Sequence, residues 1–151
     1  DEFQRTVSAQ KSSLAWSSGS QGTPPSARET SGVQLEKNAF CIFGGRGANE
    51  EHNDVHLLHL HSCLWEQPAV EGKAPRSRSG HTTNLAPGVG VVVHGGFSSE
   101  RGYLSDTAVL KASPQRFEWS PVCVSGIFPC GRDKHSAVVL ETEQGRMQMI
   151  V

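Results

Sequence analysis

The sequence predicts an all-β protein assembled from a repeated unit of about 50 residues. Three observations support this prediction. Glycine and proline contribute 16 and 8 of the 151 residues, a turn-rich composition. No apolar stripe with the 3.6-residue period of a helix runs for a useful length. Finally, four residue types recur three times in the same order, which indicates an internal repeat.

The repeat consists of a tryptophan followed by the pattern Gly-x-x-Pro-x-x-Arg. Successive arginines are 50 and 54 positions apart, and the residue three positions after each arginine is Ser31, His81 or His135. Two of the apolar runs that follow end in a double glycine. The repeated residues are Trp16, Trp65 and Trp119, Arg28, Arg78 and Arg132, and the pairs Gly44–Gly45 and Gly95–Gly96.

Each unit is expected to contain four short strands, because apolar runs of 4–8 residues alternate with clusters of glycine, proline, serine and asparagine. The first strand, a, follows the arginine, and the second, b, precedes the double glycine. The third, c, begins at an aspartate, and the fourth, d, carries the tryptophan. The expected ranges are 32–35, 81–85 and 135–140 for a; 39–43, 89–94 and 147–151 for b; 54–61 and 106–112 for c; and 63–70 and 117–124 for d.

The residues between the strands have physical roles. A double glycine allows positive φ and close approach of another backbone. Asp54 and Asp106 can accept hydrogen bonds from nearby backbone amides and so start strand c. Proline in Gly-x-x-Pro makes the connection from d to a rigid. We expect the tryptophans to pack between adjacent sheets, and His81 and His135 to be structural residues at the start of strand a.

Strands a and b are apolar on consecutive residues, as in a propeller blade that is covered on both faces. With the double glycines and the pattern Pro-x-x-Arg-x-x-His, the sequence resembles the kelch-repeat family. The pattern Gly-x-x-Pro-x-x-Arg-x-x-His is complete at 72–81 and 126–135. Ser31 departs from it in the first unit, and His94 replaces the usual aromatic residue in the second. The resemblance implies kelch-type β-propeller blades of four antiparallel strands.

The repeat divides the chain into partial and whole units. Residues 1–16 are expected to supply strands c and d of a partial blade, 17–65 and 66–119 two units, and 120–151 strands a and b of another partial blade. This makes about three blades, whereas propellers close with roughly 4–8. We therefore expect a fragment of a longer propeller. The alternative is that the half-blades complete each other, or pair between two chains to give a six-bladed dimer.

The resemblance also suggests partner-binding arginines. Kelch-like adaptors of cullin ubiquitin ligases use arginines of the d–a connection to hold acidic or carboxyl-bearing peptides, and a guanidinium can bind a carboxylate through two hydrogen bonds. The matching residues are Arg28, Arg78 and Arg132, with Arg76 beside them. The alternative is that these repeated arginines are structural and bridge neighbouring blades through backbone carbonyls.

The loops between strands b and c, 45–53 and 96–105, differ in sequence although their flanks match. Variable loops on a fixed scaffold are where binding specificity is expected; the alternative is that they are solvated turns. The candidate contact residues are Arg46, Asn49, Phe97, Ser99, Arg101 and Tyr103.

Other classes of function find little support. A net charge of −1 argues against nucleic-acid binding, and no apolar run is long enough for a membrane helix. The four cysteines form no CxxC pair, which argues against zinc and favours a reducing, intracellular compartment. His59 and His61 would share one face of a strand and His56 the other, so no metal site is expected. A copper site of the galactose-oxidase type needs tyrosines, and Tyr103 is the only one. No catalytic motif or cofactor site is expected.

The sequence therefore predicts a non-catalytic protein–protein interaction module, either a scaffold or a substrate-recruiting adaptor. It would bind a peptide or loop at the propeller mouth, where the arginines would suit an acidic segment. Its open blade edges would also permit self-association. The alternatives are the propeller domain of an enzyme whose catalytic part lies mostly elsewhere, and a structural subunit of a large assembly.

Overall fold

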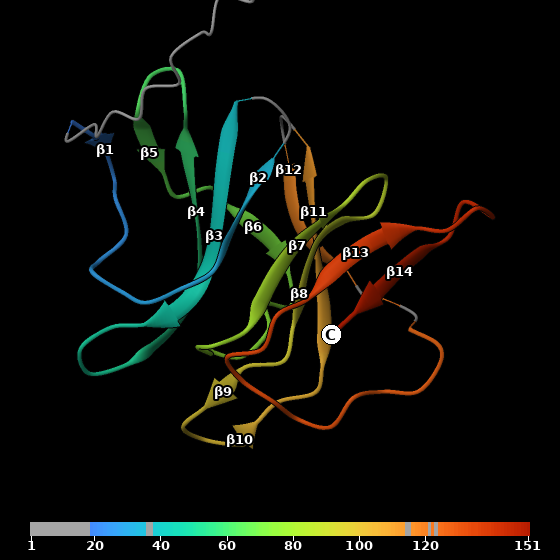
Figure 1. The fold of residues 1–151 in the computed structure, drawn as a ribbon. Coiled ribbons are helices and arrows are strands. Elements are labelled where there is room, and N and C mark those ends of the chain that lie inside the picture. Colours follow the sequence, from blue (N-terminus) through green and yellow to red (C-terminus); the bar gives the residue numbers. More distant parts are fainter. Residues whose placement is uncertain (1–18, 36–37, 114–115, 121, 123) are drawn as a thin grey trace, which may run out of the picture.

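The computed structural model describes residues 19–35, 38–113, 116–120, 122 and 124–151. All regular structure in these residues is β, which confirms the predicted fold class (Figure 1). They include no helix long and apolar enough to cross a membrane. The predictions for 1–16, including the packing of Trp16, lie outside the described residues.

The first blade, blade 1, is a five-stranded sheet. The innermost strand of the sheet is β2 and the outermost is β1, in the order β1-β5-β4-β3-β2. Neighbours are antiparallel except β1 and β5, which run parallel. The strands are β1 (Gln21–Gly22), β2 (Gly32–Leu35), β3 (Ala39–Arg46), β4 (Glu51–His59) and β5 (Leu64–Glu66).

Blade 2 repeats this arrangement in the order β6-β12-β11-β8-β7, again with its outermost strand parallel to its neighbour. A short hairpin, β9 with β10, projects from the loop between β8 and β11, and a further pair, β13 with β14, starts a third blade. The strands are β6 (Val70–Gly72), β7 (Thr82–Ala86), β8 (Gly90–His94), β9 (Phe97–Ser98), β10 (Gly102–Tyr103), β11 (Thr107–Ser113), β12 (Arg116–Ser120), β13 (Val138–Glu141) and β14 (Met147–Ile150).

The four antiparallel strands expected of each unit are present in both blades, and a fifth strand joins each outer edge. The run expected as one strand over 63–70 divides into β5, in blade 1, and β6, in blade 2. Pro68 lies between them, and a residue without a backbone N–H favours a break in the strand. The expected unit boundaries at 65 and 119 stay a prediction, although all of blade 1 precedes Val70.

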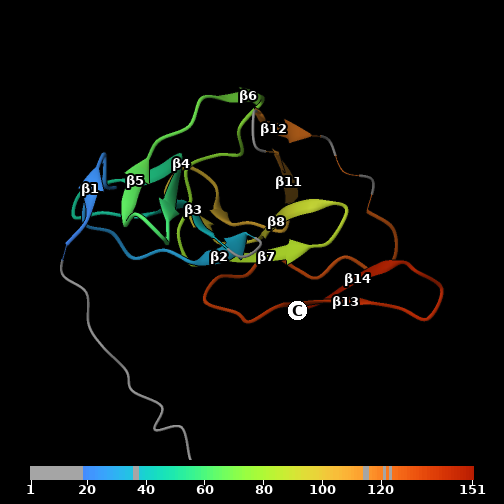
Figure 2. The same cartoon turned by 90° about the horizontal axis from the view of Figure 1, so that it is seen from above.

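The inner strands of successive blades lie side by side (Figure 2). The hydroxyls of Ser31 in the first blade and Thr83 in the second are 2.7 Å apart. Asn84 then donates a hydrogen bond to the carbonyl of Ala137 at 2.9 Å, which links β7 to the segment before β13. The described strands thus form consecutive blades of an open ring.

The main core lies between blades 1 and 2. Trp119 is 5 % exposed, and its ring meets that of Phe43 edge-on with centroids 4.9 Å apart. Cys41 and Val93 on the two b strands are fully buried in the same cluster. The packing predicted for Trp119 is therefore confirmed, whereas Trp65 is only partly buried. Burial of a large aromatic side chain here contributes about 1.5–3 kcal/mol to the cohesion of the blades.

Candidate functional site

One end of the blades brings together the loops that the sequence analysis singled out. We call this surface the loop face; it comprises the b–c loops 45–53 and 96–105 and the d–a connections 23–31 and 73–81. Figure 1 shows the β3–β4 loop and the β9–β10 hairpin at this same end. Isolated β-bridges join each b–c loop to the connection of its own blade, Glu29 to Arg46 and Ser79 to Phe97. The four segments therefore form one surface.

Arg78 is the most deeply buried charged residue of this region, with no exposed side-chain surface. Its guanidinium donates to the carbonyl of Gly95 at 2.9 Å and to both carboxylate oxygens of Asp106 at 2.9 and 2.8 Å. Arg28 makes the equivalent contacts in blade 1, with the carbonyl of Gly44 at 3.3 Å and the carboxylate of Asp54. Each arginine thus ties the start of its blade to the double glycine and to strand c.

The two aspartates stay ionised well into the acid range. Burial by itself would raise the pKa of the Asp106 carboxyl, but the hydrogen bonds and charge of Arg78 outweigh burial and hold the pKa below its ordinary value. The balance at Asp54 is the same, with His56 contributing a second hydrogen bond at 2.9 Å. Both ion pairs therefore persist at neutral pH.

These contacts favour the structural interpretation of Arg28 and Arg78 over a partner contact, because their donors are already taken by groups of their own blade. Backbone groups rather than the guanidinium join successive blades. The amide of Gly45 donates to the carbonyl of Arg78 at 2.8 Å, and the amide of Arg78 donates to the carbonyl of His52 at 3.1 Å. The amide of Gly96 repeats the first bond with Arg132, at 2.8 Å.

The second glycine of each pair also lets the d–a connection of its own blade approach closely. Gly45 has φ of +102°, and a Cβ there would lie 2.6 Å from the carbonyl oxygen of Glu29. Gly96, with φ of +99°, would meet the carbonyl oxygen of Ser79 at 2.7 Å. A side chain at either position would clash with the d–a connection, so the blade needs glycine at these positions. Gly44 and Gly95 also have positive φ, of 58° and 64°.

Arg132, the third repeated arginine, differs from the other two. It donates to the carbonyl of Cys130 at 3.2 Å and contacts the Cys130 sulfur at 3.6 Å. Among the residues that the structure describes, no carboxylate pairs with it. Within the described residues, the Arg132 guanidinium therefore lacks the carboxylate partner that Arg28 and Arg78 have.

Glu51 joins the b–c loops of the two blades and was not singled out by the sequence. Its carboxylate accepts hydrogen bonds from the backbone amide of Ser99 at 3.0 Å and from the Ser99 hydroxyl at 2.8 Å, and it pairs with Arg46 at 3.2 Å. The bond from the Ser99 amide is the main cause that holds the pKa of Glu51 below its ordinary value. Ser99, expected as a partner contact, thus also fixes the position of its own loop.

The remaining predicted contact residues lie at the surface of the loop face. Tyr103 is 64 % exposed and meets Phe97 edge-on across the β9–β10 hairpin, with centroids 5.6 Å apart. Arg76 lies 3.6 Å from Glu100. Exposed residues of the face include Arg46, Asn49, Arg101 and Tyr103. Together they offer cations and an aromatic ring, groups suited to polar and acidic protein segments.

His56, His81 and His94 are buried inside the blades, whereas His59 is partly exposed and His61 is exposed. Burial, followed by the charge of Arg78, lowers the pKa of His81 to about 4. The His94 and His135 rings meet edge-on with centroids 5.6 Å apart, and burial lowers the pKa of each. His56 is held by Asp54. Within the described part of the chain, no cluster of three or more potential ligands could hold a metal ion.

Comparison with known proteins identifies similar sequences. The model of the family described as the KLHDC2/KLHL20/DRC7 Kelch-repeats domain matches residues 1–147. Kelch domain-containing protein 2 from Bos taurus is 30% identical over 146 residues, which cover 82% of this chain and 35% of that protein. The Arabidopsis thaliana Acyl-CoA-binding domain-containing protein 5 is 32% identical over 120 residues, covering 79% and 18%. The Dictyostelium discoideum Rho GTPase-activating protein gacHH is 28% identical over 131 residues, covering 83% and 8%. The chain thus spans about a third or less of the length of these curated relatives.

Proposed function

The chain belongs to the KLHDC2/KLHL20/DRC7 Kelch-repeats family, and from this premise we propose that its loop face binds a peptide or loop of a protein partner without catalysing a reaction. Kelch-repeat domains are generally protein-interaction modules, and membership in the family matches the resemblance of the repeats. The finer proposal concerns where the partner binds and what chemistry attracts it.

The observation that carries this proposal is the clamp between Glu51 and Ser99. It holds the b–c loops of two blades against each other while Tyr103 and Arg101 remain at the surface. A surface that is ordered before binding loses less conformational entropy when the partner arrives. Exposed aromatic and arginine side chains on such a surface are the residue types that dominate binding energy at protein interfaces.

Charge favours an acidic partner. Arg46 and Arg76 are each paired with a glutamate, but their side chains are 57% and 49% exposed and can also reach a ligand. Arg101 has no ion pair among the described residues. A carboxylate of the partner would gain bidentate hydrogen bonds from a free guanidinium, so binding should weaken as salt concentration rises.

The proposed role is that of an intracellular scaffold or substrate-recruiting adaptor. An intracellular location is supported by the free thiols of Cys41, Cys63 and Cys130. The pKa values of the Asp54 and Asp106 carboxyls are lowered because both carboxylates form ion pairs that hold the blades together. This structural use of the two carboxylates supports a non-catalytic role. We also propose self-association as a second mode of binding, because β14 pairs only with β13 among the described strands.

The experiment that tests the proposal is a selection of peptides on the immobilised chain, followed by titration of the enriched peptides. We expect enrichment of acidic peptides, and at least tenfold weaker binding by the variants Arg101→Glu and Tyr103→Ala. Lys111→Glu, an exposed change of the same charge on β11 and away from the loop face, is the matched control and should bind as the wild type does. Equal affinity of all four proteins would overturn the proposal.

A further inference from the structure

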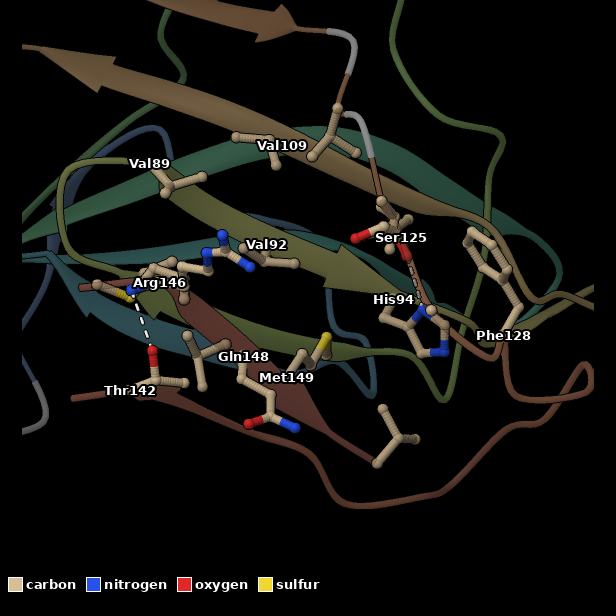
Figure 3. A pocket seen from close by; sticks show the side chains of 18 of the residues that line it. Val89, Val92, His94, Val109, Ser125, Phe128, Thr142, Arg146, Gln148 and Met149 are labelled. Carbon is tan, nitrogen blue, oxygen red and sulfur yellow. Dashed lines mark hydrogen bonds between the residues drawn. The ribbon is translucent and has the colours of Figure 1, made fainter. Parts of the chain in front are cut away.

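Two histidines meet where blade 2 contacts the segment that leads into β13. We call this contact the second joint, and the contact between blades 1 and 2 the first joint. The rings of His94 and His135 meet edge-on in the second joint, with centroids 5.6 Å apart. His94 is the last residue of β8 and is 2 % exposed. Figure 3 shows it beside the cavity between blade 2 and the β13–β14 pair. Two ionisable rings of the same kind therefore share one contact.

The repeat provides an internal reference for this pair. In the first joint His81 meets Phe43 in the same edge-on manner, with ring centroids 5.5 Å apart. Phe43 and His94 each directly precede the double glycine of their blade, and His81 and His135 each lie three positions after a repeated arginine. The two contacts thus share one geometry, but the first contains one ionisable ring and the second contains two.

Each ring of the second joint has a hydrogen-bond partner at one nitrogen only. Nδ1 of His94 lies 2.9 Å from the Thr107 hydroxyl, and Nε2 of His135 lies 3.3 Å from the Thr82 hydroxyl. Nε2 of His94 and Nδ1 of His135 are buried and have no hydrogen-bond partner among the described residues. A neutral ring can donate its single proton to the threonine, whereas a protonated ring must also bury an N–H without an acceptor.

The charges around the pair also favour neutral rings. Burial, followed by the proximity of His135, lowers the pKa of His94, and the carboxylate of Asp106 opposes this shift only in part. Asp106 is already paired with Arg78, which limits its ability to neutralise a proton on His94. Burial is likewise the main cause that lowers the pKa of His135. The other ionisable groups that act on one ring or the other are Arg78, His81, Arg132 and Asp133.

We propose that the contact between His94 and His135 is a pH-sensitive joint, which is closed when both rings are neutral and releases segment 131–137 from blade 2 when they are protonated. In the open joint both rings would be hydrated and would regain the ordinary histidine pKa of about 6.5. Below that pH the open state binds more protons than the closed state, so the closed joint loses free energy as the pH falls. This proposal goes beyond partner binding at the loop face and does not depend on it.

Backbone amides that donate across the second joint report its opening. The amide of Gly96 donates to the carbonyl of Arg132 at 2.8 Å, and the amide of Arg132 donates to the carbonyl of Leu104 at 3.1 Å. The amide of Lys134, directly before His135, donates to the carbonyl of Gly80 at 2.7 Å. Release of the histidine pair would break these three bonds and expose their amides to exchange with solvent.

The test is residue-resolved hydrogen exchange by NMR at about pH 7 and about pH 5, on either side of the ordinary histidine pKa. Each rate is divided by the intrinsic rate at the same pH, which gives the protection of that amide. The variant His94→Phe gives the second joint the aromatic pair of the first. We expect the protection of the Arg132 and Lys134 amides to fall at least tenfold more in the wild type than in this variant.

The matched control is His59→Gln, which removes a partly exposed histidine of β4 in blade 1. Its Arg132 and Lys134 amides should lose as much protection as those of the wild type. Equal losses in the wild type and His94→Phe would overturn the proposal, because the histidine pair would then contribute nothing to the pH dependence. Unchanged protection of these amides in the wild type between the two pH values would overturn it as well.

A titration of the wild-type rings by NMR does not depend on the folding of a variant. The Cε1–H resonances of His94 and His135 should titrate together, with midpoints below about 6.5, because the two sites interact. The Arg132 and Lys134 amides should lose protection over the same pH range. Independent titration of both rings at their ordinary pKa, with the amides still protected, would contradict a pH-sensitive joint.

Discussion

Arg78 and Asp106, 28 positions apart in the sequence, form a fork-to-fork ion pair with hydrogen bonds of 2.9 and 2.8 Å. The guanidinium is fully buried, whereas the aspartate side chain is 53% exposed. The Arg78–Asp106 pair closes blade 2 at the loop face, and the Arg28–Asp54 pair closes blade 1 in the same way. Because the same contact recurs at the repeat period, it belongs to the architecture of the blade.

Asp106→Ala should destabilise the fold by about 2–3 kcal/mol. Removing one partner of a buried pair leaves an uncompensated charge and costs about 3–5 kcal/mol, and the partial exposure of the Asp106 carboxylate reduces this cost. Urea unfolding followed by tryptophan fluorescence measures the change. The control is Glu71→Ala, which removes the exposed partner of Arg116 and should leave the unfolding midpoint unchanged. Similar midpoints for Asp106→Ala and the control would contradict the structural role of Arg78.

Trp119→Ala should cost about 3–5 kcal/mol, because it removes a buried ring that bridges two blades. Trp65→Ala should cost less, since Trp65 retains solvent-accessible surface in this structure. Thermal unfolding of both variants by circular dichroism provides the comparison. A larger loss for Trp65→Ala than for Trp119→Ala would show that the packing of the blades differs from this description.

Stability should fall as the pH drops from about 6.5 to 4. The pKa of His81 is about 4 in the fold and 6.5 without it, so the unfolded chain binds more protons in this range, and the folded state loses roughly 3 kcal/mol across it. The lowered pKa values of His94 and His135 act in the same direction. Asp54 and Asp106 contribute stability above their unfolded pKa that is lost only at still lower pH.

Unfolding free energies at several pH values test this dependence, with His81→Gln as the comparison. The variant should show a shallower decline between pH 6.5 and 4, whatever its stability at neutral pH. An identical slope in the variant would rule out His81 as a source of the acid sensitivity.

Glu51→Gln should loosen the contact between the two b–c loops. The amide in place of the carboxylate weakens the hydrogen bonds from Ser99 and removes the ion pair with Arg46. Faster hydrogen exchange at the Ser99 amide, with little change in melting temperature, is the expected result. Glu50→Gln, at the exposed neighbouring position, is the control. Equal exchange rates in the two variants would show that the clamp does not order the loop.

The repeat predicts much of the fold because its residues determine the backbone conformation locally. The double glycines, the proline between sheets and the consecutive apolar residues of strand b each restrict the backbone within a few positions. Their spacing therefore predicts the strands of blades 1 and 2 and the burial of Trp119. Strand β6 is different, because its partner β12 lies more than 40 residues away in the sequence and is parallel to it.

The chemistry of the loop face is less predictable for a similar reason. The sequence shows arginines and aspartates at a common period but not that Arg78 and Asp106 meet, because their contact depends on how strand c folds back beside the d–a connection. Glu51 has no counterpart in the second blade. Its hydrogen bonds with Ser99, 48 positions later, are formed only in the folded structure, so the sequence does not indicate them. Comparing the repeats with one another identifies only the residues that they share. The contact between Glu51 and Ser99 occurs between blades 1 and 2 alone among the described blades.

Hydrogen–deuterium exchange of the chain, with and without a selected acidic peptide, shows whether the loop face is the binding surface. Binding at the loop face should slow exchange in segments 45–53 and 96–105, with no change in β5 and β12, the strands next to the outermost strand of each blade. Protection confined to β5 and β12, or to β13 and β14, would contradict a binding site on the loop face.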